Sequence, residues 1–262
     1  MEILFAYCLL GVFAGTMAGL LGVGGGLIIV PALIAIWQPT SVGGIYEMQL
    51  AIGTSLATIV LTSVSSVRAH HQRNSVQWNI VWRMTPGIVL GAWLGAALAT
   101  QMSGDILKSI FGVFELLVAA QMAFSVRPDS HRALPGLVGM TMAGSAIGSV
   151  SAVIGIGGGT MTVPFLSWCN VRIHQAVGTS AACGLPIAIG GAISYLVLGW
   201  GNAALPEWSA GYVYGPALAG IAVTSMLFAP LGAALAHRLS TVVLKRSFAG
   251  FLALLGVWML LT

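Results

Sequence analysis

The sequence predicts an all-α polytopic membrane protein made of two inverted-topology repeats of about five helical segments each. The first observation is composition, because 58% of the 262 residues are hydrophobic and 6% are charged. A soluble domain has about 25% charged residues. The second observation is a series of long apolar runs, and the third is a repetition of the first half of the chain in the second half. This composition excludes a soluble enzyme, a nucleic-acid-binding protein and a disordered chain.

Eight apolar runs are long enough to cross a bilayer, which takes about 20 residues of helix. They are residues 3–21, 47–67, 79–99, 105–125, 134–154, 175–198, 211–236 and 240–262. Two shorter runs, 24–37 and 157–168, each follow a glycine cluster. We expect half-helices or re-entrant segments there, so the chain has eight to ten transmembrane helices. Non-helical backbone at such depth requires a surrounding of protein or a watery cavity.

The second half of the chain repeats the first in the same order. Residues 11–33 and 144–166 are identical at nine of 23 positions, at an offset of 133. Further matches are Gly-Thr-Ser at 53–55 and 178–180, Gly-Ala-Ala-Leu-Ala at 95–99 and 232–236, and Leu-Lys at 107–108 and 244–245. We therefore predict an N-terminal repeat over 1–127 and a C-terminal repeat over 134–262, within a single transmembrane domain.

The positions of the charges predict the orientation of the two repeats. Basic residues favour cytoplasmic loops, and nine of the ten lie in connections on one side, Lys108 being the exception. Acidic residues of the opposite side are Glu2, Glu47, Asp105 and Glu207. Since each half has an odd number of segments, the second half enters the membrane inverted, as in many secondary transporters. Both termini are then outside the cytoplasm. Parity does not distinguish full crossings from re-entrant segments for the first two segments of each half.

The glycine clusters GVGGG at 22–26 and GIGGG at 155–159 are candidates for an anion site. Glycine lets the backbone break and approach a ligand, and the helix that follows begins with unpaired N–H groups of positive partial charge. The candidate ligand-binding glycines are Gly24, Gly25, Gly26, Gly157, Gly158 and Gly159. The alternative is close helix packing. This alternative fits another set better: Gly11, Gly15, Gly19, Gly87, Gly91 and Gly95.

Hydroxyl side chains follow each glycine cluster at matching positions. Thr54 and Ser55 in the first half correspond to Thr179 and Ser180 in the second. A hydroxyl can donate to an oxyanion without the cost of a buried charge, so we expect all four to bind substrate. The alternative is that each one bonds the carbonyl four residues earlier in its own helix.

The sequence leaves alternative roles for three further side chains. Glu115 lies near the centre of its apolar run, where a carboxyl group is costly and is a candidate for proton coupling or for a structural hydrogen bond. Arg83 fits snorkelling to the cytoplasmic headgroups better than ligand binding. Cys183 lies one helical turn beyond Thr179 and is a candidate for the same cavity, although a structural thiol is the simpler interpretation.

The GLLGVGGG…VP stretch, its second copy and the Gly-Thr-Ser after each resemble the sulfite exporter TauE/SafE family over residues 3–260. The resemblance implies a bacterial inner-membrane permease for sulfite, sulfoacetate, other organosulfonates or related small anions. It implies substrate contacts for Gly24, Gly25, Gly26, Thr54, Ser55 and their counterparts. The sequence then predicts a secondary transporter that exports its substrate by alternating access around an anion site at the midplane of the membrane.

Two other functions remain as alternatives: a proton-coupled uptake permease for another small organic anion, and a membrane sensor or assembly subunit. An intramembrane enzyme is disfavoured, because all five histidines (His70, His71, His131, His174 and His237) are expected in cytoplasmic loops. No metal site or cofactor is expected. The expected partners are a small anionic substrate and the lipid bilayer, not nucleic acid, and a homodimer is left open.

Overall fold

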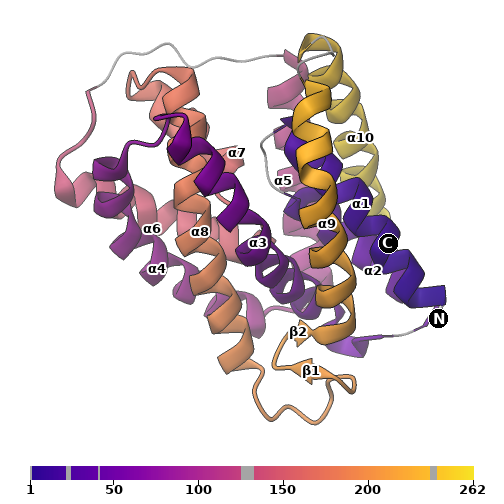
Figure 1. Cartoon of the computed structure of the whole chain (residues 1–262). Coiled ribbons are helices and arrows are strands. Elements are labelled where there is room, and N and C mark those ends of the chain that lie inside the picture. Colours follow the sequence, from indigo (N-terminus) through magenta and orange to yellow (C-terminus); the bar gives the residue numbers. More distant parts are fainter. Residues whose placement is uncertain (1, 22–24, 41, 125–132, 237–240) are drawn as a thin grey trace.

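The protein is a bundle of helices, seen in the computed structural model of Figure 1. The structure describes residues 2–21, 25–40, 42–124, 133–236 and 241–262. The helices are α1 (Glu2–Leu21), α2 (Gly26–Trp37), α3 (Glu47–Gln72), α4 (Trp78–Gln101), α5 (Gly104–Phe124), α6 (Leu137–Ile154), α7 (Gly159–Trp168), α8 (Ile173–Leu198), α9 (Gly215–Ala236) and α10 (Thr241–Leu261). A short 3-10 helix, η1 (Gly44–Tyr46), precedes α3.

These helices confirm the predicted all-α polytopic membrane protein. By length and composition, seven described helical segments can cross a membrane. The two segments predicted to be short are short, since α2 has 12 residues and α7 has 10. At about 1.5 Å per residue, neither reaches across a hydrocarbon core of about 30 Å.

The run over 211–236 was predicted to be helical from its first residue, and this boundary is wrong. A small antiparallel hairpin, β1 (Ser209–Ala210) and β2 (Val213–Tyr214), comes first, and α9 begins at Gly215. Trp208 and Gly211 have φ values of 67° and 53°, which turn the chain here. Apolar composition alone does not reveal such a turn.

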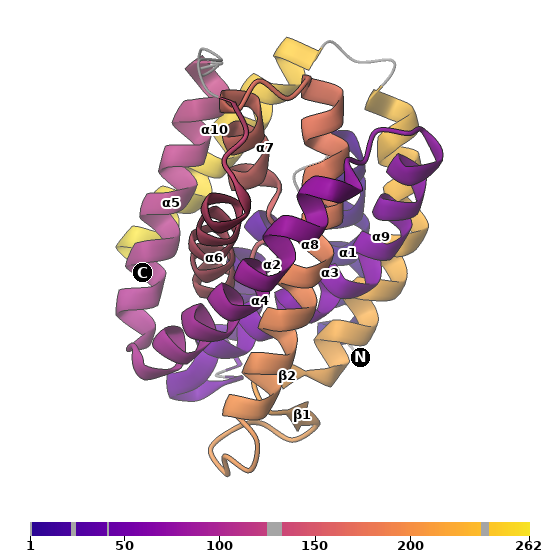
Figure 2. The same ribbon diagram turned by 90° about the vertical axis from the view of Figure 1, so that its left-hand side faces the viewer.

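Helices from the two halves of the sequence pack against each other in pairs. The helix α1 lies along α9, α4 lies along α6, α3 crosses α8, and α5 pairs with α10. Figures 1 and 2 show α9 beside α1 and α4 beside α6 from two directions. Each pair joins one helix of residues 1–127 to one of residues 134–262. The halves therefore share one interior and do not form two separate globules.

Glycines bring the paired helices α1 and α9 into backbone contact. A Cβ atom added to Gly11 would lie 2.5 Å from the carbonyl oxygen of Ile221, and one added to Gly15 would lie 2.6 Å from Cα of Ser225. The hydroxyl of Ser225 donates to the carbonyl oxygen of Gly11 at 2.9 Å. Small residues that let backbones approach are typical of membrane helix interfaces.

The interface between α4 and α6 has the same construction. Cβ atoms on Gly87, Gly91 and Gly95 would collide with backbone atoms of Thr141, Ser145 and Ser149. The Ser149 hydroxyl donates to the carbonyl oxygen of Gly91 at 2.9 Å. These contacts confirm the close-packing interpretation for five of the six glycines to which it was assigned.

The charged residues in the described part of the chain divide between the two ends of the bundle. Arg73 caps the end of α3 and Arg172 the start of α8, at the upper end of Figure 1. Glu47 and Asp105 lie in the first turns of α3 and α5, and Glu207 lies just before the β1–β2 hairpin at the lower end. This agrees with the predicted partition of charge. His70 and His71 lie in the last turn of α3, and His174 lies in the first turn of α8, so these three were wrongly expected in loops.

We predict that Gly91→Ala destabilises the protein, because its Cβ would overlap the backbone of Ser145. Overpacking of this kind costs about 1–3 kcal/mol. The control is Gly250→Ala on α10, where nothing lies within 4 Å of the added atom; it should be neutral or stabilise by up to about 1 kcal/mol. Thermal unfolding of both variants in detergent measures the difference. Equal melting temperatures would show that the close α4–α6 backbone contact does not limit the stability of the protein.

Candidate functional site

The two glycine turns lie against each other inside the bundle. Gly26 begins α2, and Gly155 ends α6 in the left-handed conformation with φ 80°. A Cβ on Gly26 would lie 2.9 Å from Cα of Ile156 and closer still to the carbonyl oxygen of Gly155. Only glycine fits this position. The structure thus brings together turns that are more than a hundred residues apart; of the candidate glycines, Gly24 lies outside the described residues.

Ser55 lies at the glycine turn of the opposite half. Its hydroxyl is fully buried and donates to the carbonyl oxygen of Gly155 at 2.8 Å. The backbone of Ile52 is close to the same turn, since a Cβ on Gly155 would lie 3.1 Å from Cα of Ile52. The helix α3 therefore supports the turn of the second half, and the Ser55 proton already has an acceptor.

Thr54 and Thr179 have matching contacts with the opposite half. The hydroxyl oxygen of Thr54 accepts from the backbone N–H of Tyr214 at 2.9 Å, just before α9. The hydroxyl oxygen of Thr179 accepts from the backbone N–H of Gln77 at 2.9 Å, just before α4. Both threonines are fully buried. Each therefore supplies an acceptor to the entry of a helix in the other half, a role that was considered neither in the expectation of substrate binding nor in the alternative of a bond within its own helix.

The turn of the second half has a group of hydroxyls without hydrogen-bond partners among the described residues. They belong to Ser151, Thr160, Thr162 and Ser180, and all four side chains are buried. Gly157 and Gly158 lie at the start of α7, where a Cβ on Gly158 would lie 2.9 Å from Oγ1 of Thr162. Ser180 was predicted from the sequence; Ser151, Thr160 and Thr162 were missed, because each reads as an ordinary small polar residue in an apolar run.

Glu115 lies in a different interface. It is fully buried on α5, and neither carboxyl oxygen has a hydrogen-bond partner among the described residues. Its Cβ lies 3.2 Å from the position that a Cβ on Gly256 of α10 would take. Glu115 therefore belongs to the α5–α10 pair, whereas the glycine turns lie among α2, α3, α6 and α7.

The two other candidate side chains take ordinary positions. Arg83 is exposed on the surface of α4, as expected for a snorkelling side chain. Cys183 is a fully buried free thiol on α8. Neither position requires contact with a ligand.

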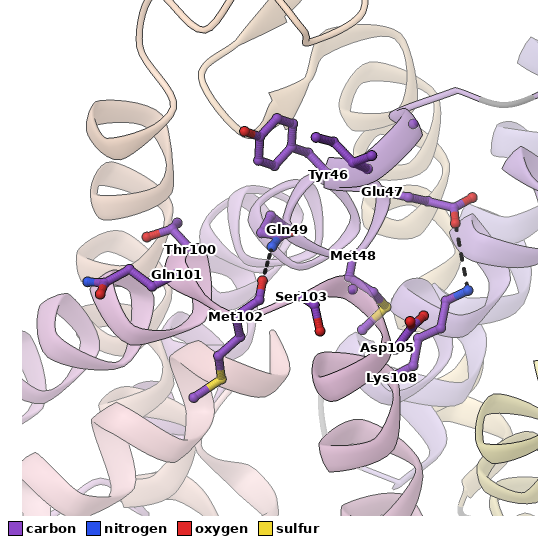
Figure 3. Close-up of a pocket in the computed structure, with 13 residues that line it drawn as sticks. Tyr46, Glu47, Met48, Gln49, Thr100, Gln101, Met102, Ser103, Asp105 and Lys108 are labelled. Atoms are coloured by element: carbon purple, nitrogen blue, oxygen red, sulfur yellow. Dashed lines mark hydrogen bonds and ion pairs between the residues drawn. The ribbon is translucent and has the colours of Figure 1, made fainter.

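A cavity of about 600 Å³ opens at the end of the bundle where α3 and α5 begin. Figure 3 shows Glu47, Gln49 and Lys108 around it, with the α4–α5 connection along one side. Lys108 and Glu47 form an ion pair at 4.0 Å, and the Gln49 amide donates to the carbonyl oxygen of Met102 at 2.9 Å. Sequence reasoning missed this cavity, although Lys108 was the exception among the basic residues.

Comparison with known proteins places the chain in a family. The model of the sulfite exporter TauE/SafE family matches residues 7–259. This chain belongs to the TauE/SafE family. A probable membrane transporter protein of Haemophilus influenzae is 38% identical to it over 97% of both chains. One of Methanocaldococcus jannaschii is 28% identical over 97% of this chain and 94% of its own, and YdhB of Bacillus subtilis is 25% identical over 94% and 96%. No solved structure matches the chain.

The family and these relatives are membrane transporters. The TauE/SafE protein described here is therefore a multi-pass membrane transporter and not an enzyme. The paired glycine motif and the Gly-Thr-Ser after it were sufficient to identify this family from the sequence.

We predict that Thr54→Val and Thr179→Val each destabilise this TauE/SafE transporter. Each change leaves a buried backbone N–H, of Tyr214 or Gln77, without its acceptor, which costs about 1–3 kcal/mol. Thr54→Ser and Thr179→Ser are the matched controls, because serine keeps the hydroxyl. Melting temperatures in detergent measure the effect. If the valine variants melt like the serine variants, these hydroxyls do not stabilise the helix entries.

Proposed function

We propose that this protein is a secondary transporter that exports small sulfur-containing anions such as sulfite, sulfoacetate or other organosulfonates. The contact between Gly26 and the Gly155 turn is the observation on which the proposal depends. It joins the start of α2 to the glycine-rich turn between α6 and α7 in the interior of one bundle. Helix N-termini favour anions because their N–H groups are unpaired and their dipole is positive. Sulfite comes from the family's own description, and sulfoacetate and other organosulfonates come from the resemblance of the sequence to this family.

Reciprocal contacts between the halves support an inverted repeat. Gly11 packs on Ile221 and Gly15 on Ser225; their counterparts Gly144 and Gly148 pack on Met84 and Ile88. Gly95 packs on Ser149, and its counterpart Gly232 packs on Thr16, which is the counterpart of Ser149. Each contact has a partner in which the two halves exchange roles.

The hydrogen bonds of the two threonines also form a pair in which the halves exchange roles. Thr54 of the first half holds the entry of α9, and Thr179 of the second half holds the entry of α4. A pseudo-twofold axis between the halves produces such pairs. In transporters built this way, rocking of one unit against the other exposes a central site to each side in turn.

We infer that the protein lies in the inner membrane of a bacterium with the β1–β2 end and both termini outside the cytoplasm. The support is the partition of charge: Arg73 and Arg172 lie at the opposite end from Glu47, Asp105 and Glu207. Basic residues favour the cytoplasmic side.

A reporter fused after Thr262 tests this orientation. We expect alkaline phosphatase to be active there and green fluorescent protein to be dark in a fusion exported by the Sec pathway. A fusion after Arg73 in a truncated chain serves as the opposite control. A fluorescent C-terminal fusion would reverse the assigned orientation.

Export of an anion needs no second ion. An inside-negative potential favours exit by about 2.3 kcal/mol per charge per 100 mV. The chain has no GxxxxGK[ST] phosphate loop for ATP, since its lysines are Lys108 and Lys245 and neither follows such a loop. Proton-coupled uptake is the second candidate, because Glu115 is a buried carboxyl group without a partner among the described residues.

Flux into proteoliposomes under an imposed potential separates these functions. We expect sulfite and sulfoacetate flux that follows the potential, is independent of a pH gradient and survives Glu115→Gln. Flux that requires the pH gradient and is lost in Glu115→Gln would replace export by proton-coupled uptake. If none of these anions moves under either gradient, the proposed substrate class or the proposed function is wrong.

A further inference from the structure

We propose that the anion is held by the second-half turn alone, by the buried hydroxyls of Thr162 on α7 and Ser180 on α8 together with those of Ser151 and Thr160. This inference rests on the proposed transport of anions. It replaces a symmetric site, shared equally by both glycine turns, with one that has polar ligands from a single half.

The four hydroxyls are buried donors without partners among the described residues. Ser151 and Thr162 are 0% exposed and Ser180 is 1% exposed. Buried polar groups are nearly always hydrogen-bonded in native proteins. Several unpartnered hydroxyls around one turn therefore indicate a ligand that accepts hydrogen bonds.

The geometry places Thr162 and Ser180 beside the start of α7. Oγ1 of Thr162 lies 2.9 Å from where a Cβ on Gly158 would be. Gly184 of α8 faces the backbone nitrogen of Gly158, with 3.9 Å between that nitrogen and a Cβ on Gly184. Ser180 lies one turn before Gly184 and so shares its face of α8. The side chain of Ile187, also on α8, packs against Gly158, with its Cδ1 2.5 Å from where a Cβ would be.

Backbone donors add to the hydroxyls. Among the described residues, nothing accepts a hydrogen bond from the N–H of Gly157 or Gly158. Both groups precede α7, where the helix dipole is positive. The start of α7 thus offers N–H and O–H donors together.

The first half lacks this arrangement. The counterparts of Thr160 and Thr162 are Leu27 and Ile29, which are buried and apolar. The counterpart of Ser180 is Ser55, whose hydroxyl already donates to the carbonyl oxygen of Gly155. The first half therefore has no free hydroxyl at the positions that correspond to Thr160 and Thr162 of α7 and to Ser180 of α8.

The test measures binding and flux of methanesulfonate, acetate and sulfate with the purified full-length protein. We expect saturable flux of methanesulfonate. Ser180→Ala and Thr162→Val should each lower its apparent affinity by about 10- to 150-fold, the value of a hydrogen bond to a charged group. Thr162→Ser keeps the hydroxyl and should stay within about threefold of the parent protein.

Matched controls come from buried hydroxyls that are already satisfied. Ser194 on α8 donates to the carbonyl oxygen of Gly190 at 2.6 Å, and Thr58 on α3 donates to that of Thr54 at 2.9 Å. Ser194→Ala and Thr58→Val should leave the affinity unchanged. Thr162→Ile copies the residue of the first half and should resemble Thr162→Val. Melting temperatures identify any variant that fails to fold. If Thr162→Val is such a variant, the affinities of Thr162→Ser and Ser180→Ala decide whether these hydroxyls bind the anion.

The outcomes separate this inference from the proposed function. If the parent protein moves anions and the Ser180 and Thr162 variants match the controls, the one-sided site is wrong and anion transport stands. If the parent protein moves none of the anions in any gradient, the proposed function itself fails.

Discussion

The fold depends on close backbone contact between helices of opposite halves. In a bilayer the lipid tails are as apolar as the side chains, so helices gain little from hiding apolar surface from each other. Gly11 and Gly15 on α1, and Gly87 and Gly91 on α4, allow van der Waals contact of backbones instead. Both interfaces pair a helix of one half with a helix of the other, so neither half has a complete set of neighbours by itself.

The same contacts position the glycine turns. Since α6 is fixed on α4, the turn that follows α6 meets the start of α2 in the interior. Gly26 then lies on the backbone at Gly155, and Ser55 donates to the carbonyl oxygen of Gly155. Broken helices are tolerated within a membrane where surrounding protein satisfies the freed backbone groups, and here α3 supplies part of that surrounding.

The two halves share an architecture but differ in polarity where the short helices begin. Leu27 and Ile29 give α2 an apolar first turn, whereas Thr160 and Thr162 give α7 a polar one. Inverted repeats provide two similar packings for alternating access. Binding has no need of the same symmetry, because one set of donors suffices for one small ligand.

Composition and repetition determined the class of fold, the number of segments, the two short helices and the family. These properties follow from local sequence: a run of about 20 apolar residues must be helical in a bilayer, and a paired GxGGG motif is visible without neighbours. The tertiary structure decided which groups meet. There the hydroxyls of Thr54 and Thr179 bond the entries of helices, that of Ser55 bonds a carbonyl oxygen, and those of Thr162 and Ser180 have no partner among the described residues. Each of these hydrogen bonds joins residues at least a hundred positions apart, and no local pattern shows whether such a partner is present.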